Sequence, residues 1–288
     1  MAPVFVSSTH GVRIAVHPLN AAPDDAPVLV FCHALGFCAP MYAPLARALG
    51  TGVRCLGIDL RYHGASSSPS EPTFDWREFG DDVLAVLDSE LVPEGATLHG
   101  FGHSLGGAAL TLAAARRPGR FASLYFYEPV IPPPNVIPGF GARNAMAEMA
   151  EKRRARFESR EAAHANFRAK PPFALFDAEA LAAYVDDALE PDEDGSVSLR
   201  CKPAFEAALY RTAGESGAFD VADTLGTRVR LAMGRLGPDG PVAFAAAVAA
   251  KLGAGEPRRF EAYGHFGPFD APATIAADVA AWLGDGPG

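Results

Sequence analysis

The sequence predicts an α/β fold, a doubly wound, mostly parallel sheet of eight strands that is interrupted once by a helical insertion. Short apolar runs alternate along the chain with longer helix-forming stretches, which is typical of strand–helix–strand units. Some of these runs are apolar at every position, as expected for strands buried on both faces of a parallel sheet. One long stretch of helix formers breaks the alternation, and the strand pattern then returns.

The expected elements follow one another in a regular order. The strands are expected at 3–7, 12–17, 27–33, 53–58, the run just before Gly102, 122–127, 228–233 and 257–262. The helices are expected at 41–49, 74–90, the alanine-rich run after Ser104, 241–252 and 273–283. The first two strands alternate around a turn, as in a hairpin. Right-handed crossovers between the later strands would place helices on both faces of the sheet.

The insertion begins where three prolines follow Ile131. From about residue 142 to residue 210 the chain consists mostly of helix formers with interleaved acidic and basic residues. Because the strand pattern resumes only at 228–233, we expect residues 1–131 and 226–288 to form the core. Residues 132–225 are then a helical insertion.

Composition excludes several classes of function. Apolar residues make up 49% and charged residues 20% of the 288 positions, which allows a large buried core. The net charge of −9 argues against binding nucleic acid, because that requires basic clusters facing phosphates. The N-terminus has no basic segment followed by an apolar run, and no run approaches membrane-spanning length. We therefore expect a cytoplasmic protein without a membrane partner.

The cysteine spacing does not indicate a metal site. The chain contains Cys32, Cys38, Cys55 and Cys201, whose spacing matches no zinc pattern. Cys32 and Cys55 lie in apolar runs, where a free thiol behaves as a small apolar side chain. Reduced cysteines buried in the core are the expected state.

The strongest local motif is Gly102-His103-Ser104-Leu105-Gly106, placed between an expected strand and an expected helix. A sharp strand-to-helix turn would expose the Ser104 hydroxyl above the helix N-terminus, where backbone N–H groups favour negative charge. Glycine is needed on either side because a Cβ there would clash with neighbouring elements. The alternative interpretation is a serine that only caps the helix, but capping does not require both glycines.

This stretch resembles the nucleophile elbow of the α/β-hydrolase family. Two further segments resemble the same family: His33-Ala34-Leu35-Gly36, with Ala34 where glycine is usual, and Asp59 to Ser66, with Tyr62 in place of a glycine. The resemblance implies that Ser104 is the nucleophile and that the N–H groups of Leu35 and Leu105 form the oxyanion hole. It also implies that the insertion is a lid over the site.

The candidate base is His265, in a Gly264-His265-Phe266 segment that resembles the family's histidine loop before the last helix. Imidazole suits the role because its pKa lies near neutrality, so it can take and return the serine proton. His33 and His103 are expected to be structural, since one nucleophile needs one base. Asp59 and Arg61 are expected to order a turn.

The acid that orients the base has two candidates. Asp239 follows the strand after the lid, two positions later than the family pattern, whereas Glu128 ends the strand after the elbow helix. Family members of the haloalkane dehalogenase branch take their acid from that second place. We favour Glu128, because a charge ending such an apolar strand requires a partner. A structural role for Glu128, bonded to lid backbone or an arginine, is the alternative.

These residues predict a serine hydrolase that cleaves a carboxylic ester through an acyl-enzyme. No cofactor and no metal are expected, because acyl transfer to water needs neither. The lid aromatics are either substrate contacts or the lid's own core: Phe157, Phe167, Phe173, Phe176 and Tyr184. The basic residues between 148 and 170 form either a cationic mouth or a solvated helix face. The expected partner is a small molecule with an apolar portion.

Other reactions use the same side chains. The alternatives are a C–C bond hydrolase, a lactonase or an acyltransferase with the same triad. A further alternative is a ligand receptor of the same fold that lacks turnover.

Overall fold

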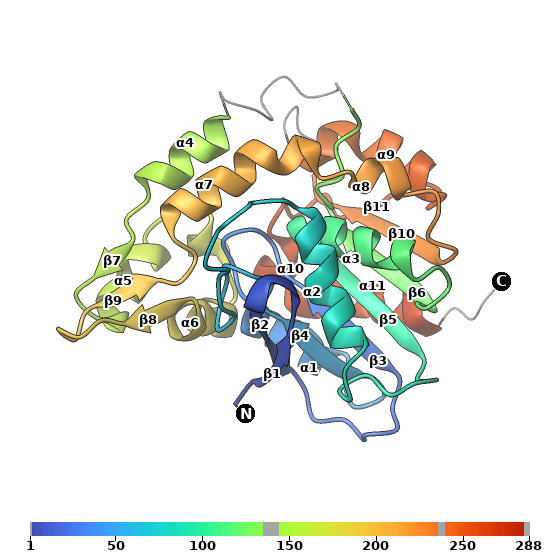
Figure 1. Ribbon diagram of the computed structural model, residues 1–288, viewed down its shortest axis with the longest axis horizontal. Coiled ribbons are helices and arrows are strands. Elements are labelled where there is room, and N and C mark those ends of the chain that lie inside the picture. The colour runs from blue at the N-terminus through green and yellow to red at the C-terminus, as the bar shows by residue number, and fades with distance from the viewer. Residues whose placement is uncertain (1, 135–143, 236–239, 285–288) are drawn as a thin grey trace.

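The computed structural model describes residues 2–134, 144–235 and 240–284, and it confirms the predicted α/β architecture (Figure 1). Eight strands form one sheet in the order β1-β2-β4-β3-β5-β6-β10-β11. The first two strands run antiparallel to their neighbours, and the remaining pairs are parallel. The strand bounds are β1 Val4–Ser7, β2 Arg13–Pro18, β3 Val28–Cys32, β4 Arg54–Ile58, β5 Leu98–His103, β6 Ser123–Tyr127, β10 Arg228–Met233 and β11 Arg258–Arg259.

The centre of the sheet positions the candidate site. Every residue of β3, β5 and β6 is buried, as the apolar runs predicted for parallel strands. Strand β5 pairs with β3 on one side and β6 on the other, with Gly102 opposite Cys32 and Phe126. The chain segments that follow these three strands therefore emerge side by side at one edge of the sheet.

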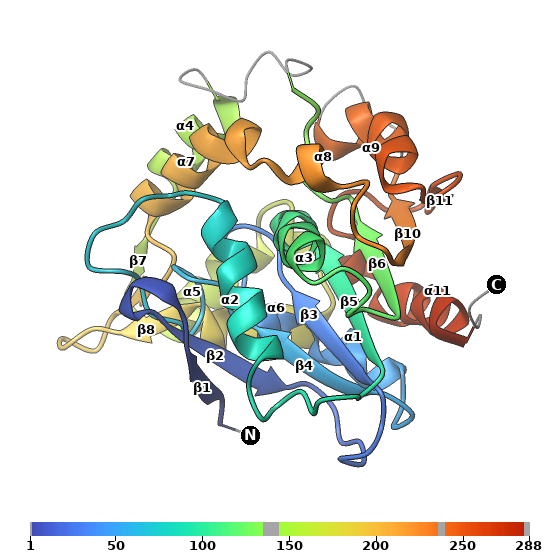
Figure 2. The ribbon, with the colours of Figure 1, turned by 45° about the vertical axis from the view of Figure 1, so that its right-hand side comes forward.

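Helices cover both faces of this sheet (Figure 2). One face packs against α2 (Arg77–Leu87), α3 (Leu105–Arg116) and α9 (Ala245–Leu252), together with the short α8 (Ala218–Val221). The other face packs against α1 (Ala43–Ala48), α10 (Gly267–Asp270) and α11 (Pro272–Gly284). Short 3₁₀ turns η1 (Thr9–Gly11), η2 (Ala39–Tyr42) and η5 (Gly240–Phe244) complete this part of the chain.

The helix expected at 74–90 is shorter in the structure at both of its ends. The helix expected at 74–90 begins at Arg77, because Phe74 has a φ of 53° that a helix cannot contain. The Asp75 side chain instead accepts the Arg77 N–H at 2.9 Å and turns the chain into the helix. At the other end, the Ser89 hydroxyl bonds the Val86 carbonyl, and the helix stops at Leu87.

The insertion contains a small sheet that its helix-forming composition did not predict. Strands β7 (Arg156–Phe157), β8 (Leu189–Pro191) and β9 (Val197–Leu199) pair antiparallel in the order β7-β9-β8. Strands this short carry too few residues to show an alternating pattern. The surrounding helices are α4 (Ala145–Lys152), α5 (Arg160–Arg168), α6 (Ala178–Asp187) and α7 (Pro203–Thr212), with η3 (Phe173–Leu175) and η4 (Ala213–Glu215). These elements lie together on the left of Figure 1. The boundaries at 132–225 stay a prediction.

All four cysteines are buried and free, in agreement with the expectation of reduced core thiols. Burial raises the pKa of the Cys55 thiol to about 12. A neutral thiol of this kind packs as a small apolar side chain. Among the described residues, no helix is both long enough and apolar enough to cross a bilayer.

Candidate active site

Ser104 lies at the sharp turn between β5 and α3. Its φ of 54° and ψ of −114° lie outside the regions that side-chain-bearing residues usually adopt. A Cβ added to Gly106 would lie 2.0 Å from the Cys32 carbonyl oxygen, and one added to Gly102 would lie 2.7 Å from Gly107 Cα. The two glycines of the motif are therefore required by close backbone packing, and the serine is held in a strained conformation.

The backbone of Ser104 is fixed beside Glu128. The Ser104 N–H donates to the Tyr127 carbonyl at 3.1 Å, and the Val130 N–H donates to the Ser104 carbonyl at 3.0 Å. Because these partners flank Glu128 in sequence, the turns after β5 and β6 form one unit. Glu128 itself has a φ of 44°, which redirects the chain at the end of β6.

The Glu128 carboxylate joins two other parts of the chain. Its Oε2 lies 2.6 Å from His265 Nδ1, and its Oε1 accepts the Gly234 N–H at 2.8 Å. The side chain of Glu128 is only 3% exposed, whereas that of His265 is 28% exposed. Since a carboxylate accepts, His265 donates from Nδ1, and its Nε2 is left as an acceptor. Among the described residues, the partners of Glu128 are an imidazole and a core backbone group, and none is an arginine. Asp239 lies outside the described residues.

The segment 263–267, called here the histidine loop, is attached to the core by its backbone. The Tyr127 hydroxyl donates to the Gly264 carbonyl at 2.8 Å, and the Arg235 N–H donates to the Tyr263 carbonyl at 2.8 Å. A Cβ at Gly267 would lie 2.2 Å from the Tyr127 hydroxyl oxygen, so glycine is needed for this approach. These contacts place His265 next to the end of β6.

The segment 33–37, called here the oxyanion loop, leaves one backbone donor available. The Ala34 N–H donates to the Tyr42 hydroxyl at 3.2 Å, and the Gly36 N–H donates to His63 Nε2 at 3.1 Å. The N–H groups of Leu35 and Leu105 donate to no acceptor within the part of the chain that the structure describes. Leu105 is the first residue of α3, where helix N–H groups lack partners in the preceding turn.

Two buried histidines join the oxyanion loop to the turn after β4. His33 Nε2 accepts the Leu60 N–H at 3.0 Å, and His63 Nε2 accepts the Gly36 N–H. The rings lie 4.8 Å apart. Burial lowers the pKa of both imidazoles, that of His63 to about 3, so both are neutral acceptors at neutral pH. His33 therefore has the structural contacts that the sequence predicted.

The turn of Asp59 and Arg61 also has the expected structural contacts. The buried Asp59 carboxylate accepts the Ala39 N–H at 2.7 Å, the Ala65 N–H at 2.8 Å and His17 Nε2 at 2.8 Å. Hydrogen bonding and charge from His17 keep the Asp59 pKa below its ordinary value despite burial. The Arg61 guanidinium is fully buried and bonds the carboxylates of Glu78 and Asp82.

The family is decided by comparison with known proteins. The model of the alpha/beta hydrolase family matches residues 29–278. The chain belongs to this family. Among curated relatives of this alpha/beta hydrolase, 3-oxoadipate enol-lactonase 1 of Acinetobacter baylyi is 29% identical over 121 residues, which are 42% of the chain and 43% of the relative. Human monoglyceride lipase is 35% identical over 101 residues, which are 34% of the chain and 33% of the relative. The matches thus span less than half of either relative.

Solved structures share the fold over nearly the whole chain. A peroxisomal alpha-beta-hydrolase from Saccharomyces cerevisiae has a TM-score of 0.76 at 17% identity, covering 94% of this chain and 81% of that one. An E-2-(acetamidomethylene)succinate hydrolase has a TM-score of 0.76 at 17% identity, covering 98% and 99%. These likenesses establish the fold of this alpha/beta hydrolase.

The aromatic residues of the insertion contact the oxyanion loop and the histidine loop as well as one another. Phe37, directly after Gly36, lies with ring centroids 5.9 Å from Phe173 and 5.6 Å from Tyr184. Phe266, directly after His265, lies 5.6 Å from Phe176. Phe157 and Phe167 contact each other within the insertion, with ring centroids 5.1 Å apart. The five rings therefore divide between contacts inside the insertion and contacts with the two core loops.

Two of the basic residues expected at 148–170 form ion pairs within the insertion. Arg153 bonds Glu206 and the Tyr184 hydroxyl, and Arg156 bonds Asp194. A Cβ at Gly36 would lie 2.7 Å from Glu206 Oε1, so this ion pair sits against the oxyanion loop.

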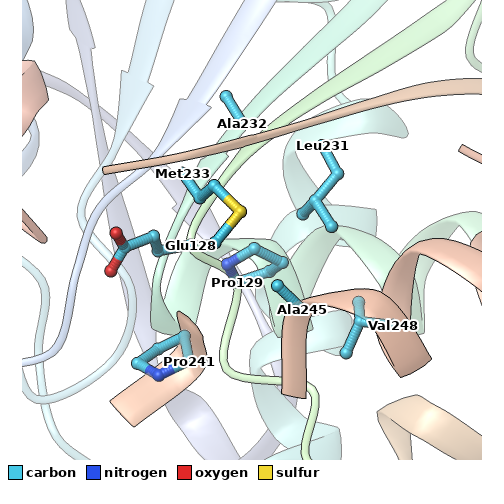
Figure 3. A pocket seen from close by; sticks show the side chains of 8 residues that line it. All are labelled: Glu128, Pro129, Leu231, Ala232, Met233, Pro241, Ala245 and Val248. Atoms are coloured by element: carbon cyan, nitrogen blue, oxygen red, sulfur yellow. The ribbon is translucent and has the colours of Figure 1, made fainter. Parts of the chain in front are cut away.

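A small cavity lies beside Glu128, between the end of β10 and α9 (Figure 3). Its volume of about 10 Å³ is near the minimum for a single water molecule and is too small for a substrate. Its lining is apolar apart from Glu128: Pro129, Leu231, Ala232, Met233, Pro241, Ala245 and Val248. The apolar lining limits the access of solvent to the Glu128 carboxylate from this side. Among the described residues, no group of three or more His, Cys, Asp or Glu side chains could hold a metal ion.

Sequence reasoning did not single out two residues that contact the site. Tyr42 bonds the oxyanion loop and also His103, and His63 holds Gly36. Tyr42 lies at the start of an expected helix, and His63 lies in a turn, where neither matches a catalytic pattern. Only the folded arrangement brings their polar atoms to the site.

Proposed function

We propose that this protein is a serine hydrolase that cleaves carboxylic esters with Ser104 as nucleophile, His265 as base and Glu128 as acid. The observation that carries the proposal is the 2.6 Å contact between Glu128 Oε2 and His265 Nδ1, next to the strained turn of Ser104. A carboxylate on that nitrogen leaves Nε2 as the acceptor that a serine hydroxyl needs.

In the first step, Ser104 Oγ attacks the ester carbonyl while His265 Nε2 accepts the hydroxyl proton. The carbonyl oxygen becomes an oxyanion and accepts hydrogen bonds from the Leu35 and Leu105 N–H groups. His265 then gives its proton to the departing alcohol, which leaves an acyl group on Ser104. Water repeats the sequence, with His265 again as base, and releases the acid.

The surrounding protein contributes mainly by positioning charge. An oxyanion donor contributes about 3 kcal/mol in related chemistry, because it is already aimed at the developing charge. Glu128 stabilises the imidazolium, and it is itself held by Gly234 and shielded from solvent.

The substrate that fits best is a small or medium ester with an apolar portion. Phe37 lies in the oxyanion loop, Phe266 directly follows His265, and both contact lid aromatics. An apolar acyl or alcohol group would be desolvated by such a wall. A lactone is the second candidate, because the enol-lactonase relative acts on a cyclic ester by name.

The test is steady-state kinetics on p-nitrophenyl esters of increasing acyl length, with Ser104→Ala, Glu128→Gln and Asp239→Asn as variants. We expect turnover by the wild type and by Asp239→Asn, and losses of several orders of magnitude in the other two. A competing alcohol added to the assay separates hydrolysis from acyl transfer by the products formed. A wild type that is inert on all esters and lactones, and unlabelled by a fluorophosphonate, contradicts the proposal.

A further inference from the structure

We propose that Tyr42 and His103 are positioning residues, whose hydrogen bonds tie the oxyanion loop to the backbone of His265. The inference rests on the proposed function of Ser104 and His265. Three contacts carry it: Ala34 N–H to Tyr42 Oη at 3.2 Å, Tyr42 Oη to His103 Nδ1 at 2.8 Å, and His103 Nε2 to the His265 carbonyl oxygen at 2.8 Å.

These three hydrogen bonds, called here the relay, begin and end at backbone groups, which fixes the direction of every bond. The Ala34 N–H can only donate, so Tyr42 Oη accepts there and keeps its own hydrogen for His103. The His265 carbonyl can only accept, so His103 must carry its hydrogen on Nε2. His103 Nδ1 is then an acceptor, and the Tyr42 hydroxyl is the donor that it requires.

Burial keeps His103 in this neutral form. Both Tyr42 and His103 are 0% exposed. Desolvation, and then the charge of nearby His265, lower the pKa of His103 well below its ordinary value. A neutral ring is also needed next to His265, since the two imidazole centroids are 5.0 Å apart and a second positive charge would oppose the imidazolium.

The relay contacts His265 itself and the residues next to Leu35 and Ser104, so it touches or adjoins all three groups of the proposed reaction. Ala34 precedes Leu35, the proposed oxyanion donor, and His103 precedes Ser104. His265 is held directly, through its own carbonyl. The relay therefore sets the spacing between the oxyanion hole, the nucleophile and the base, and a displacement of about 1 Å in such a site costs about 100-fold in rate.

The first test compares Tyr42→Phe with Tyr125→Phe. Both tyrosines are buried in the same core cluster, but the Tyr125 hydroxyl donates to Asp278 on α11, away from the site. We expect Tyr42→Phe to lower kcat about 10- to 100-fold with KM changed less than about threefold. Tyr125→Phe should lose about as much thermal stability as Tyr42→Phe but keep the kcat of the wild type. Equal kcat in the two variants overturns the proposal.

The second test replaces His103 by glutamine and by phenylalanine. A glutamine amide can accept from Tyr42 and donate to the His265 carbonyl, whereas phenylalanine can do neither. We expect His103→Gln to keep kcat within about fivefold of the wild type and His103→Phe to lose it as Tyr42→Phe does. Equal losses in both variants, with both folded, contradict a positioning role.

A third measurement does not depend on activity. In ¹⁵N-histidine NMR spectra of the wild type, His103 should be neutral, with its hydrogen on Nε2, from about pH 6 to pH 9. In Tyr42→Phe the Nδ1 shift should move, because its donor is lost. A hydrogen on Nδ1 in the wild type overturns the relay even if ester hydrolysis is established. If the wild type shows no turnover but gives the expected spectrum, the proposed function is wrong, and the relay then has no catalytic role.

Discussion

Replacing Glu128 by glutamine should disable the proposed base by moving the ring hydrogen of His265 from Nδ1 to Nε2. Glu128 accepts two hydrogen bonds, one from the Gly234 N–H and one from His265 Nδ1. A glutamine has only one oxygen, so it can satisfy one of these donors. The Gly234 N–H is buried backbone and cannot change its role, and it therefore claims the amide oxygen.

The amide NH₂ must then face His265 Nδ1 at a spacing near 2.6 Å. Nδ1 becomes an acceptor, the ring hydrogen moves to Nε2, and Nε2 can no longer take the Ser104 proton. In the opposite orientation, the amide NH₂ would face the Gly234 N–H at a spacing near 2.8 Å. The Gly234 N–H would then be buried without an acceptor, which costs about 1–3 kcal/mol. The wrong tautomer is thus the lower-energy state.

A wrong tautomer of this kind lowers kcat about 10⁴-fold, which corresponds to about 5 kcal/mol of transition-state stabilisation. The assay is kcat on p-nitrophenyl butyrate, with a thermal melt to show that the variant is folded. Asp278→Asn is the matched control, because Asp278 also accepts from a buried side chain on β6 but lies away from Ser104. A folded Glu128→Gln variant within tenfold of the wild type refutes the reasoning.

Three further predictions concern stability. Gly106→Ala should lower the free energy of unfolding by about 1–3 kcal/mol and abolish turnover, because the new Cβ would clash with the Cys32 carbonyl oxygen. A urea midpoint equal to that of the wild type would contradict the close packing. Tyr62 has a φ of 71°, so Tyr62→Gly should be more stable in urea than Tyr62→Ala by about 1 kcal/mol, the reverse of the usual order outside turns. The pKa of His63 is lowered to about 3, so the neutral ring stabilises the fold at pH values above the ordinary histidine pKa, and this stabilisation is lost as the pH falls. In His63→Gln the free energy of unfolding should therefore fall less steeply below about pH 6, by up to ~1.4 kcal/mol per pH unit. Parallel curves of unfolding free energy against pH for the two proteins would be the opposing result.

The sequence predicted the core of the fold because its strands are buried on both faces and therefore apolar throughout. The elbow was visible for a local reason, since two glycines are required within five residues. Glu128 could be favoured because a carboxylate at the end of an apolar strand needs a partner, and the structure places that partner at His265. The catalytic roles of these residues stay predictions.

The missed features depend on contacts between distant segments. Tyr42 has no motif of its own, and its hydroxyl matters only because the fold brings it to His103, 61 positions away. The β7-β9-β8 sheet was missed because its strands have two or three residues each. The left-handed Tyr62 explains why glycine is usual at that position, but the sequence alone could not show how its ring packs against Phe74 and Phe205.

The central claim is that Ser104 is an activated nucleophile, and covalent labelling tests it most directly. The protein is incubated with a fluorophosphonate, digested, and mapped by mass spectrometry, with Ser104→Ala as control. We predict one phosphonyl group per chain, on the peptide that contains Ser104, and none in the variant. No label on the folded wild type, or a label that persists in Ser104→Ala, would contradict the account.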